Sequence, residues 1–326
     1  MLWNKILILL VLHLTGNKKF IFRHTKKSWQ LKDYINYVRQ QENKDNFIQI
    51  KTSKYSKNVQ ILKDMIYYCV NVDLDEYPEL RETLEKNLPS SILFRGNYDL
   101  LSYLRSIIKG MTCPQIYIKV SGTWTGGHEE NNRFRSINMN HGPGSSDWYG
   151  VRMKDSLVFR ELVMAQYNMD IYRKEGIWFP NLEWFMTNKI KVLYGVQEDA
   201  DIAMVGVGCL HWVRARGHSI NSSWNFGTKD LIQIKSSYER DTINKDINYI
   251  SLVKLNTLIL DYLNHEMKCV PNDIFEFCED KIKNAINQGN IEVDNVYKYF
   301  NQKKLRIYKE PYVINILYLG LSYNQL

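Results

Sequence analysis

The stretch YIKVSGTWTGGHEENNRFRSINMN, residues 117–140, decides how the fold is interpreted. Runs that alternate between apolar and polar residues flank a turn rich in Gly and Thr, which is typical of strands in an antiparallel barrel or sandwich. Because strand side chains alternate between two faces, Tyr117 and Lys119 share one face, and Ser136 and Asn138 share another. An eight-stranded double-sheet barrel that holds a small ligand can be polar inside. These four residues are therefore candidate interior groups, and a solvated polar face is the alternative.

The same stretch contains two candidate metal ligands. His128 and Glu130 share a face if the chain is extended there, and His211 follows about 80 residues later in an apolar run. Two His and one carboxylate on one side of a metal form the facial triad of non-haem Fe(II) oxygenases. The spacing alone is weak evidence, because a lone His in an apolar run is more often a core residue. The motif HEMKC at His265 is excluded, since Cys269 stands where a zinc-protease helix needs its second His.

Composition limits the class of protein. With 326 residues, 44% hydrophobic and 13% aromatic, the chain can bury a sizeable core and is not a disordered protein. The formal net charge of +8 suits a partner that carries phosphates, but Lys and Arg alternate with Asp and Glu, as on an ordinary solvated surface. The five cysteines form no C-x-x-C pair, so they indicate neither a disulfide framework nor a zinc ribbon and fit a reducing compartment.

The chain is expected to divide into four segments. They are an apolar N-terminal segment, a helical and linker region that packs on the barrel, the barrel itself and a C-terminal helical region, at residues 1–14, 15–110, 111–230 and 231–326. In the first segment a single Lys precedes an apolar run from Ile6 to Leu14, which has the shape of a secretory signal peptide and is too short to span a bilayer. A wrongly assigned start and a buried strand are the alternatives.

Helices are expected on both sides of the barrel. Apolar residues recur at helical spacing over Leu31–Val38 and over Leu100–Ile108, where Asn97 is a candidate N-cap and Gly110 a stop. Helical spacing returns from Asp241 onward. Pro271 and Asp273 then open a further helix, which runs through Ile286 to Gly289.

Several blocks of this sequence resemble the catalytic JmjC domain of the UTX branch of histone lysine demethylases. They are Gln115–Asn140, the following GPGSSDWYGV, WFPNLE at Trp178–Glu183 and CLHWVRARGHSINSSWNFG at Cys209–Gly227. A thinner similarity extends upstream to TGNKKFIF at Thr15–Phe22 and downstream to about Ile307. The resemblance implies an α+β fold, namely a double-stranded β-helix of the jelly-roll or cupin type with flanking N- and C-terminal helices.

The resemblance also implies site residues and cofactors. Fe(II) would be held by three ligands: His128, Glu130 and His211. The cosubstrate 2-oxoglutarate would contact four residues: Lys119, Thr125, Ser136 and Asn138. Lys119 would face the distal carboxylate, and Tyr117 would lie near the methylated lysine. Dioxygen would take the last position on the iron.

The implied function is an Fe(II)- and 2-oxoglutarate-dependent dioxygenase of the nucleus that demethylates di- or trimethylated lysine 27 of histone H3, releasing formaldehyde. Its partners would be the H3 tail and nucleosomal DNA or a chromatin complex, with no membrane. Two alternatives stay open: a JmjC protein hydroxylase that acts on a non-histone target, and a catalytically idle JmjC-like module that binds chromatin. A secretory location follows only if the apolar N-terminus is a signal peptide.

Three departures from the family pattern bear on substrate. The C-terminal KEPYVINILYLGLSYNQL lacks the cysteine pairs of the family's zinc-binding module, Gly206 and Val207 replace an Asn-Ala pair, and Arg135 stands where a small residue is usual. None of them removes a metal ligand. We expect weak, short-peptide recognition, with outside contacts supplying the remaining grip.

Overall fold

The computed structural model describes residues 7–14, 20–29, 31–41, 47–51, 58–62, 66–173, 176, 178, 182–266, 269–288, 307–310 and 313–316. The chain divides into two compact units. Unit 1 combines Met1–Ser102 with Ser106–Leu252, and unit 2 combines Tyr103–Arg105 with Val253–Leu326.

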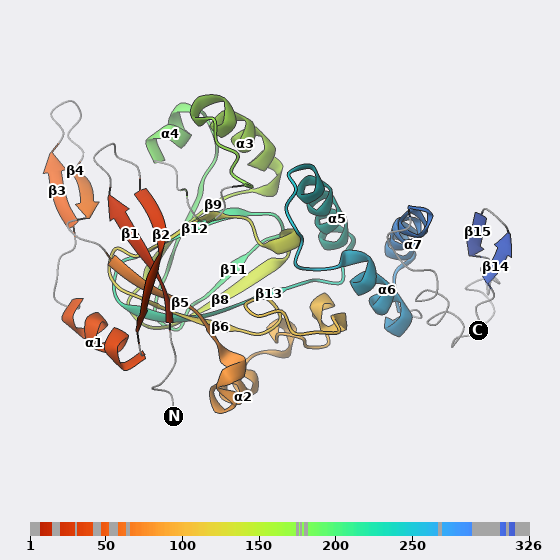
Figure 1. Cartoon of the computed structure of the whole chain (residues 1–326), viewed down its shortest axis with the longest axis horizontal. Coiled ribbons are helices and arrows are strands. Elements are labelled where there is room, and N and C mark those ends of the chain that lie inside the picture. The colour runs from red at the N-terminus through yellow and green to blue at the C-terminus, as the bar shows by residue number, and fades with distance from the viewer. Residues whose placement is uncertain are drawn as a thin grey trace. The chain divides into compact units, whose positions relative to one another are not determined.

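Two antiparallel sheets form the centre of unit 1 (Figure 1). The larger sheet has the order β11-β8-β13-β6-β5-β1-β2, and the smaller has the order β10-β9-β12-β7. Their strands are β1 Leu7–Leu14, β2 Phe20–Trp29, β5 Ile66–Asp73, β6 Gln115–Lys119, β7 Trp124–His128, β8 Arg135–Pro143, β9 Ser146–Val151, β10 Leu193–Gln197, β11 Ile202–Val205, β12 Leu210–Ala215 and β13 Ser219–Phe226. Short hairpins pair β3 Phe47–Lys51 with β4 Asn58–Leu62, and β14 Ile307–Glu310 with β15 Val313–Ile316.

The helices precede, interrupt and follow these strands. They are α1 Leu31–Gln41, α2 Pro78–Asn87, α3 Met153–Tyr167, α4 Leu182–Thr187, α5 Leu231–Asp246, α6 Leu255–Glu266 and α7 Asn272–Asn287. Single 3-10 turns occur at Leu74–Glu76, Ser90–Ile92, Leu100–Tyr103 and Asn131–Arg133. Two antiparallel sheets with flanking helices confirm the expected α+β class. Among the described helices, none is long and apolar enough to cross a bilayer.

The apolar N-terminal segment forms a strand. β1 pairs with β2 on one side and with β5 on the other, so it is part of the larger sheet. Of the three interpretations of this segment, the strand agrees with the structure.

The helix predictions had mixed outcomes. Leu31–Val38 lies in α1, and α7 begins directly after Pro271, as predicted; Gly289 lies outside the described residues. The helix predicted over Leu100–Ile108 is wrong, because only a 3-10 turn forms, over Leu100–Tyr103. Most helical stability comes from packing of an apolar face. Ile107 would lie on that face, but it is 49% exposed and so does not pack against a core.

The first C-terminal helix starts before Asp241, where helical spacing becomes evident in the sequence. Helical structure begins at Leu231 rather than at Asp241, because the side chain of Asp230 accepts a hydrogen bond from the backbone N–H of Gln233 and so caps α5.

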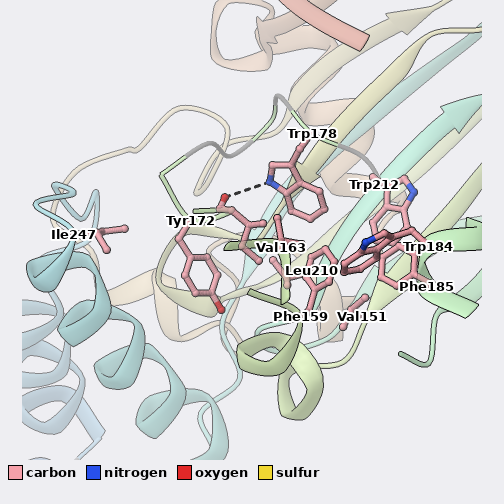
Figure 2. Close-up of a cluster of buried hydrophobic side chains, with 11 residues drawn as sticks. Val151, Phe159, Val163, Tyr172, Trp178, Trp184, Phe185, Leu210, Trp212 and Ile247 are labelled. Carbon is pink, nitrogen blue, oxygen red and sulfur yellow. Dashed lines mark hydrogen bonds between the residues drawn. The ribbon is translucent and has the colours of Figure 1, made fainter. Parts of the chain in front are cut away.

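Aromatic rings cover the outer face of the smaller sheet (Figure 2). The Trp212 indole of β12 lies parallel to the rings of Phe185 on α4 and Tyr149 on β9, with centroid distances of 5.3 and 5.6 Å. Phe159 of α3 packs against Phe185 and Trp178. Stacked aromatic pairs add specific geometry to a large burial of apolar area, so this cluster fixes the position of β12.

Two further apolar clusters pack on parts of the outer face of the larger sheet. Tyr34 and Val38 of α1 pack against Cys69 and Val72 of β5. Elsewhere Phe94 lies edge-on to Trp224 of β13, at 5.9 Å between ring centroids. The inward faces of the two sheets carry the polar groups.

Those inward positions are polar and yet buried. The buried polar side chains from the two sheets include Lys119, Ser136, Asn138, Asn140, Gln197, His211, Ser219, Asn221 and Asn225. Buried polar groups need partners, so a polar interior of this kind is expected to be hydrogen-bonded, to hold a ligand, or both.

Unit 2 contains α6 and α7. The guanidinium of Arg105 donates two hydrogen bonds to the carboxylate of Asp261 on α6, at 2.7 and 2.9 Å, and Tyr103 donates to Glu266. These hydrogen bonds join Tyr103 and Arg105 to α6.

Candidate metal centre

Three ligand atoms converge between the ends of β7 and β12. In the antiparallel pairing of these strands, His211 lies directly opposite His128. Leu210 and Trp212 belong to the outer aromatic cluster, so His211 between them points to the inner face. Glu130 follows β7 by two residues. The ligand atoms of His128, Glu130 and His211 all lie within 4.8 Å of one another.

The two imidazoles are held in the same tautomeric arrangement. The Nδ1 atom of His128 lies 2.9 Å from the Gly126 carbonyl oxygen, and Nδ1 of His211 lies 3.2 Å from the Cys209 carbonyl oxygen. A carbonyl can only accept, so each Nδ1 carries the proton and each Nε2 lone pair is available to a metal. Both Nε2 atoms face Oε1 of Glu130, at 3.8 and 3.5 Å.

The surroundings of Glu130 favour its ionised form. Burial alone would raise the pKa of its carboxyl group, but electrostatic interactions with His128 and His211 and hydrogen bonds from Asn225 and Ser136 together lower it. The Asn225 amide donates to Oε2 at 2.8 Å, which leaves Oε1 on the side of the imidazoles. Burial also lowers the pKa of His211, so its imidazole is neutral and able to act as a ligand near neutral pH.

This donor set fits a divalent iron ion. Two imidazoles and one carboxylate on one side of a metal are the ligands of the non-haem iron triad, and hydrogen bonds behind each ligand fix its orientation. His128, Glu130 and His211 would hold the ion.

The wall beside the triad carries the residues expected to contact a cosubstrate. Lys119 is 3% exposed, and its burial lowers the pKa of the ammonium group to about 8. No acidic side chain among the described residues forms an ion pair with Lys119. This cation is therefore suited to bind an organic anion. Tyr117 lies on the same strand, and burial and the charge of Glu130 raise the pKa of its phenol.

Thr125, Ser136 and Asn138 are linked to this site by contacts. The Thr125 hydroxyl lies 3.3 Å from the Tyr68 hydroxyl, and the Tyr68 ring contacts that of Tyr117. Ser136 contributes to the low pKa of the Glu130 carboxyl, and Asn138 belongs to a buried amide network. The structure therefore brings the eight residues singled out in the sequence to the inner faces of one pair of sheets, while their roles in binding remain predictions.

Four polar residues of the site were missed. Tyr68, Gln197, Asn221 and Asn225 contact Thr125, Asn138 or Glu130 from β5, β10 and β13. The alternation of SINSSWNF does place Asn221 and Asn225 on one face, and that signal could have found them. Tyr68 and Gln197 lack such a signal, because their place depends on which strands become neighbours.

A buried ionic cluster lies behind the metal loop. Glu129 accepts hydrogen bonds from Arg133, at 3.1 Å, and from Arg240 of α5, and all three side chains are almost fully buried. Arg240 also lies over the Tyr172 ring, 4.1 Å from its centroid. The cluster ties the HEENN loop to α5, and the loop needs support because Asn132 and Arg133 have positive φ values of 50° and 57°.

Gly127 is required by close packing next to His128. The Trp178 ring occupies the space where a Cβ of residue 127 would lie, and backbone hydrogen bonds join Gly127 to Gly176 and Trp178. The segment after α3 therefore lies directly against the metal-bearing end of β7.

Comparison with known proteins agrees with this geometry. Residues 115–226, which run from the start of β6 to the end of β13, match the family described as "JmjC domain, hydroxylase". The chain contains a JmjC domain. This domain includes His128, Glu130 and His211, and a His-Glu-His triad of this kind fits the Fe(II) site typical of JmjC enzymes.

Relatives of the JmjC domain include three lysine-specific demethylases. The chain is 32% identical over 206 residues to lysine-specific demethylase 6B of Homo sapiens, covering 61% of this chain and 12% of that protein. It is 29% identical over 174 residues to lysine-specific demethylase jmjd-3.1 of Caenorhabditis elegans, covering 53% and 16%. It is 23% identical over 190 residues to lysine-specific demethylase REF6 of Arabidopsis thaliana, covering 55% and 14%. The chain thus spans only a small part of each relative.

Two of the departures from the family pattern lie in the JmjC domain and leave the triad in place. The Arg135 guanidinium donates to Thr228 and lies 3.4 Å from Asp230 at the start of α5. Gly206 and Val207 lie in the connection between β11 and β12.

Proposed function

We propose that the protein is an Fe(II)- and 2-oxoglutarate-dependent dioxygenase that removes methyl groups from lysine 27 of histone H3, in its di- or trimethylated forms. The observation that carries the proposal is the convergence of the ligand atoms of His128, Glu130 and His211. The buried ammonium of Lys119 supports it. The names of the related demethylases support N-methyl-lysine as the substrate class. We further propose that the two sheets form the double-stranded β-helix of the cupin type.

Each residue of the site would have a distinct task. The imidazoles and the Glu130 carboxylate hold the ion on one side and leave its other positions to 2-oxoglutarate and dioxygen. Lys119 pairs with the distal carboxylate of 2-oxoglutarate, where Thr125 and Asn138 add hydrogen bonds. Ser136 and Asn225 keep Glu130 ionised and oriented. Tyr117 would position the methylated side chain through its ring and hydroxyl.

Bound iron, with 2-oxoglutarate and dioxygen, supplies an oxidant that hydroxylates an N-methyl group, while 2-oxoglutarate becomes succinate and carbon dioxide. The resulting N-hydroxymethyl group breaks its bond to nitrogen and leaves as formaldehyde, so the lysine carries one methyl group fewer. Hydrogen abstraction from carbon needs no lone pair on nitrogen, which makes a trimethylated lysine accessible. The polar residues of this chain would keep the reacting groups oriented.

Partners follow from the proposed substrate. The H3 tail is basic and extended, so a positively charged protein would gain little from long-range attraction to it. We propose that nucleosomal DNA or a chromatin protein adds affinity and that the protein acts in the nucleus.

The test is incubation of purified protein with Fe(II), 2-oxoglutarate and a panel of methylated H3 peptides, followed by mass spectrometry. We expect loss of methyl groups from the lysine 27 peptide and formation of formaldehyde. A stable gain of one oxygen on a non-histone peptide alone would replace the proposal with a protein hydroxylase. Failure to consume 2-oxoglutarate with any peptide would indicate an idle module.

A second comparison tests the partner proposal. Demethylation of the lysine 27 peptide is compared with that of the same mark on nucleosomes, at low and moderate salt. We expect faster turnover on nucleosomes and a loss of that advantage as salt rises. Equal rates on both substrates with no effect of salt would contradict a contribution from DNA.

A further inference from the structure

We propose that Gln197 is a positioning residue that fixes a cosubstrate-binding amide and a metal-ligating imidazole at the same time. Gln197 is the last residue of β10 in the smaller sheet, and the chain turns directly from it into β11 of the larger sheet. It is 3% exposed. The inference rests on the proposed function, because it assigns Asn138 to 2-oxoglutarate and His211 to iron.

The hydrogen-bond partners of Gln197 distinguish its amide oxygen from its amide nitrogen. Trp148 Nε1 lies 2.9 Å from one side-chain atom, and an indole N–H can only donate, so that atom is the Gln197 oxygen. The other atom lies 2.8 Å from the Asn138 carbonyl oxygen and 3.1 Å from that of Asp201. Carbonyl oxygens can only accept, so this atom is the Gln197 nitrogen.

That orientation fixes the Asn138 side chain in turn. The Gln197 nitrogen lies 3.3 Å from a side-chain atom of Asn138, which must be the amide oxygen because the neighbour is a donor. The Asn221 amide nitrogen donates to the same oxygen, at 3.0 Å, and Asn221 is itself oriented by the Ser219 hydroxyl. With its oxygen held by two donors, Asn138 presents its NH₂ group as a donor, which suits a carboxylate ligand.

The opposite end of Gln197 acts on the metal side. The Trp148 indole, held by its hydrogen bond to Gln197, lies parallel to the His211 imidazole, with 5.9 Å between centroids and 13° between planes. Trp148 and His211 are on neighbouring strands, β9 and β12. The indole therefore limits rotation of the imidazole about its side-chain bonds, in addition to the hydrogen bond at its Nδ1.

One neutral side chain thus connects the two ligand-binding groups. A merely structural glutamine would contribute to stability without affecting the affinity of the folded protein for either ligand. A positioning glutamine would change both affinities, because Asn138 could then turn its oxygen toward the carboxylate and Trp148 could leave the imidazole.

The experiment uses binding rather than turnover, on the full chain. Calorimetry measures the affinity for Mn²⁺, which replaces iron without oxidation, and then the affinity for 2-oxoglutarate at saturating Mn²⁺. Gln197→Met keeps the size of the side chain and removes every hydrogen bond. We expect its dissociation constant for 2-oxoglutarate to rise about tenfold and that for Mn²⁺ to rise several-fold.

Trp148→Phe separates the two ends and serves if Gln197→Met does not fold. Its ring can still pack beside His211 but no longer bonds to Gln197, so we expect weaker Mn²⁺ binding with an affinity for 2-oxoglutarate within about twofold of wild type. Unchanged affinities in folded Gln197→Met, or unchanged Mn²⁺ affinity in Trp148→Phe, would overturn the positioning role. Wild-type protein that binds Mn²⁺ but not 2-oxoglutarate would instead overturn the proposed function.

Discussion

Two buried polar clusters flank the candidate iron site, one charged and one neutral. The charged cluster of Glu129, Arg133 and Arg240 lies between the HEENN loop and α5. The neutral cluster of Gln197, Asn138 and Asn221 lies at the wall that carries the cosubstrate residues. We infer that the charged cluster holds a loop with unfavourable φ values. The amide cluster would instead serve the recognition of a charged ligand.

The physical reason is electrostatic interference. A fixed negative charge beside Lys119 would compete with the 2-oxoglutarate dianion for the ammonium group. At low dielectric, a fixed charge of either sign would repel the ammonium or the dianion. Amides orient hydrogen bonds without a net charge. Behind the loop no ligand is expected, so a strong and well-bonded ionic cluster carries no such cost there.

The largest expected effect separates the stabilities of the two clusters. Arg240→Met leaves the Glu129 carboxylate buried with Arg133 as its remaining partner in the cluster, and breaking a buried pair typically costs about 3 to 5 kcal/mol. Asn221→Ala removes neutral hydrogen bonds, for which about 1 to 3 kcal/mol is expected. Urea unfolding of both variants measures the difference. Equal losses in the free energy of unfolding would remove the distinction between the clusters.

A second prediction uses the buried cation Lys119 on β6. Burial lowers the pKa of Lys119 in the folded protein, so keeping it charged at pH 7 costs about 3 kcal/mol at most. Lys119→Met should therefore stabilise the ligand-free protein by roughly 1 to 3 kcal/mol, while its affinity for 2-oxoglutarate falls about 30-fold or more. Thermal unfolding and calorimetry test the two halves. A destabilised variant with normal affinity would show that Lys119 does not face the ligand.

A smaller effect follows from the same group when pH is varied. The Lys119 pKa of about 8 in the free protein means that binding the dianion above that pH requires uptake of a proton. Affinity for 2-oxoglutarate should be constant below the pKa and should fall by up to about tenfold per pH unit above it. Stability of the ligand-free protein should change in the opposite sense, rising between pH 8 and the pKa of the unfolded chain.

Lys119→Arg is the matched control for the pH experiment. A guanidinium stays charged throughout the range, so this variant should lose the pH dependence of affinity that arises from Lys119. If the variant keeps the full dependence, another group is responsible.

Strand alternation predicted much of this site. The faces of Lys119, Ser136 and Asn138 follow from period-two alternation in β6 and β8, and the H-x-E spacing places His128 and Glu130 together. These are local properties, so a single sequence contains them. His211 was a candidate from the sequence alone, and the resemblance to JmjC domains favoured it as the partner of that pair.

The rest depends on which segments become neighbours. Gln197 contacts Asn138 where the chain passes from β10 of the smaller sheet to β11 of the larger sheet. Arg240 contacts Glu129 across 111 positions of sequence. Periodicity also predicted a helix over Leu100–Ile108 that does not form, since a pattern cannot show whether a core is present to receive it. Pairwise contacts between distant segments are what sequence alone did not provide.

The most direct test of the central claim is the iron-dependent conversion of 2-oxoglutarate to succinate by wild-type protein and His211→Ala. His265→Ala is the control, because it removes a histidine of the HEMKC motif in α6, outside the triad. We predict that His211→Ala folds but loses Fe(II)-dependent turnover, and that His265→Ala retains it. Full turnover in His211→Ala would contradict the assignment of His128, Glu130 and His211 as one iron site.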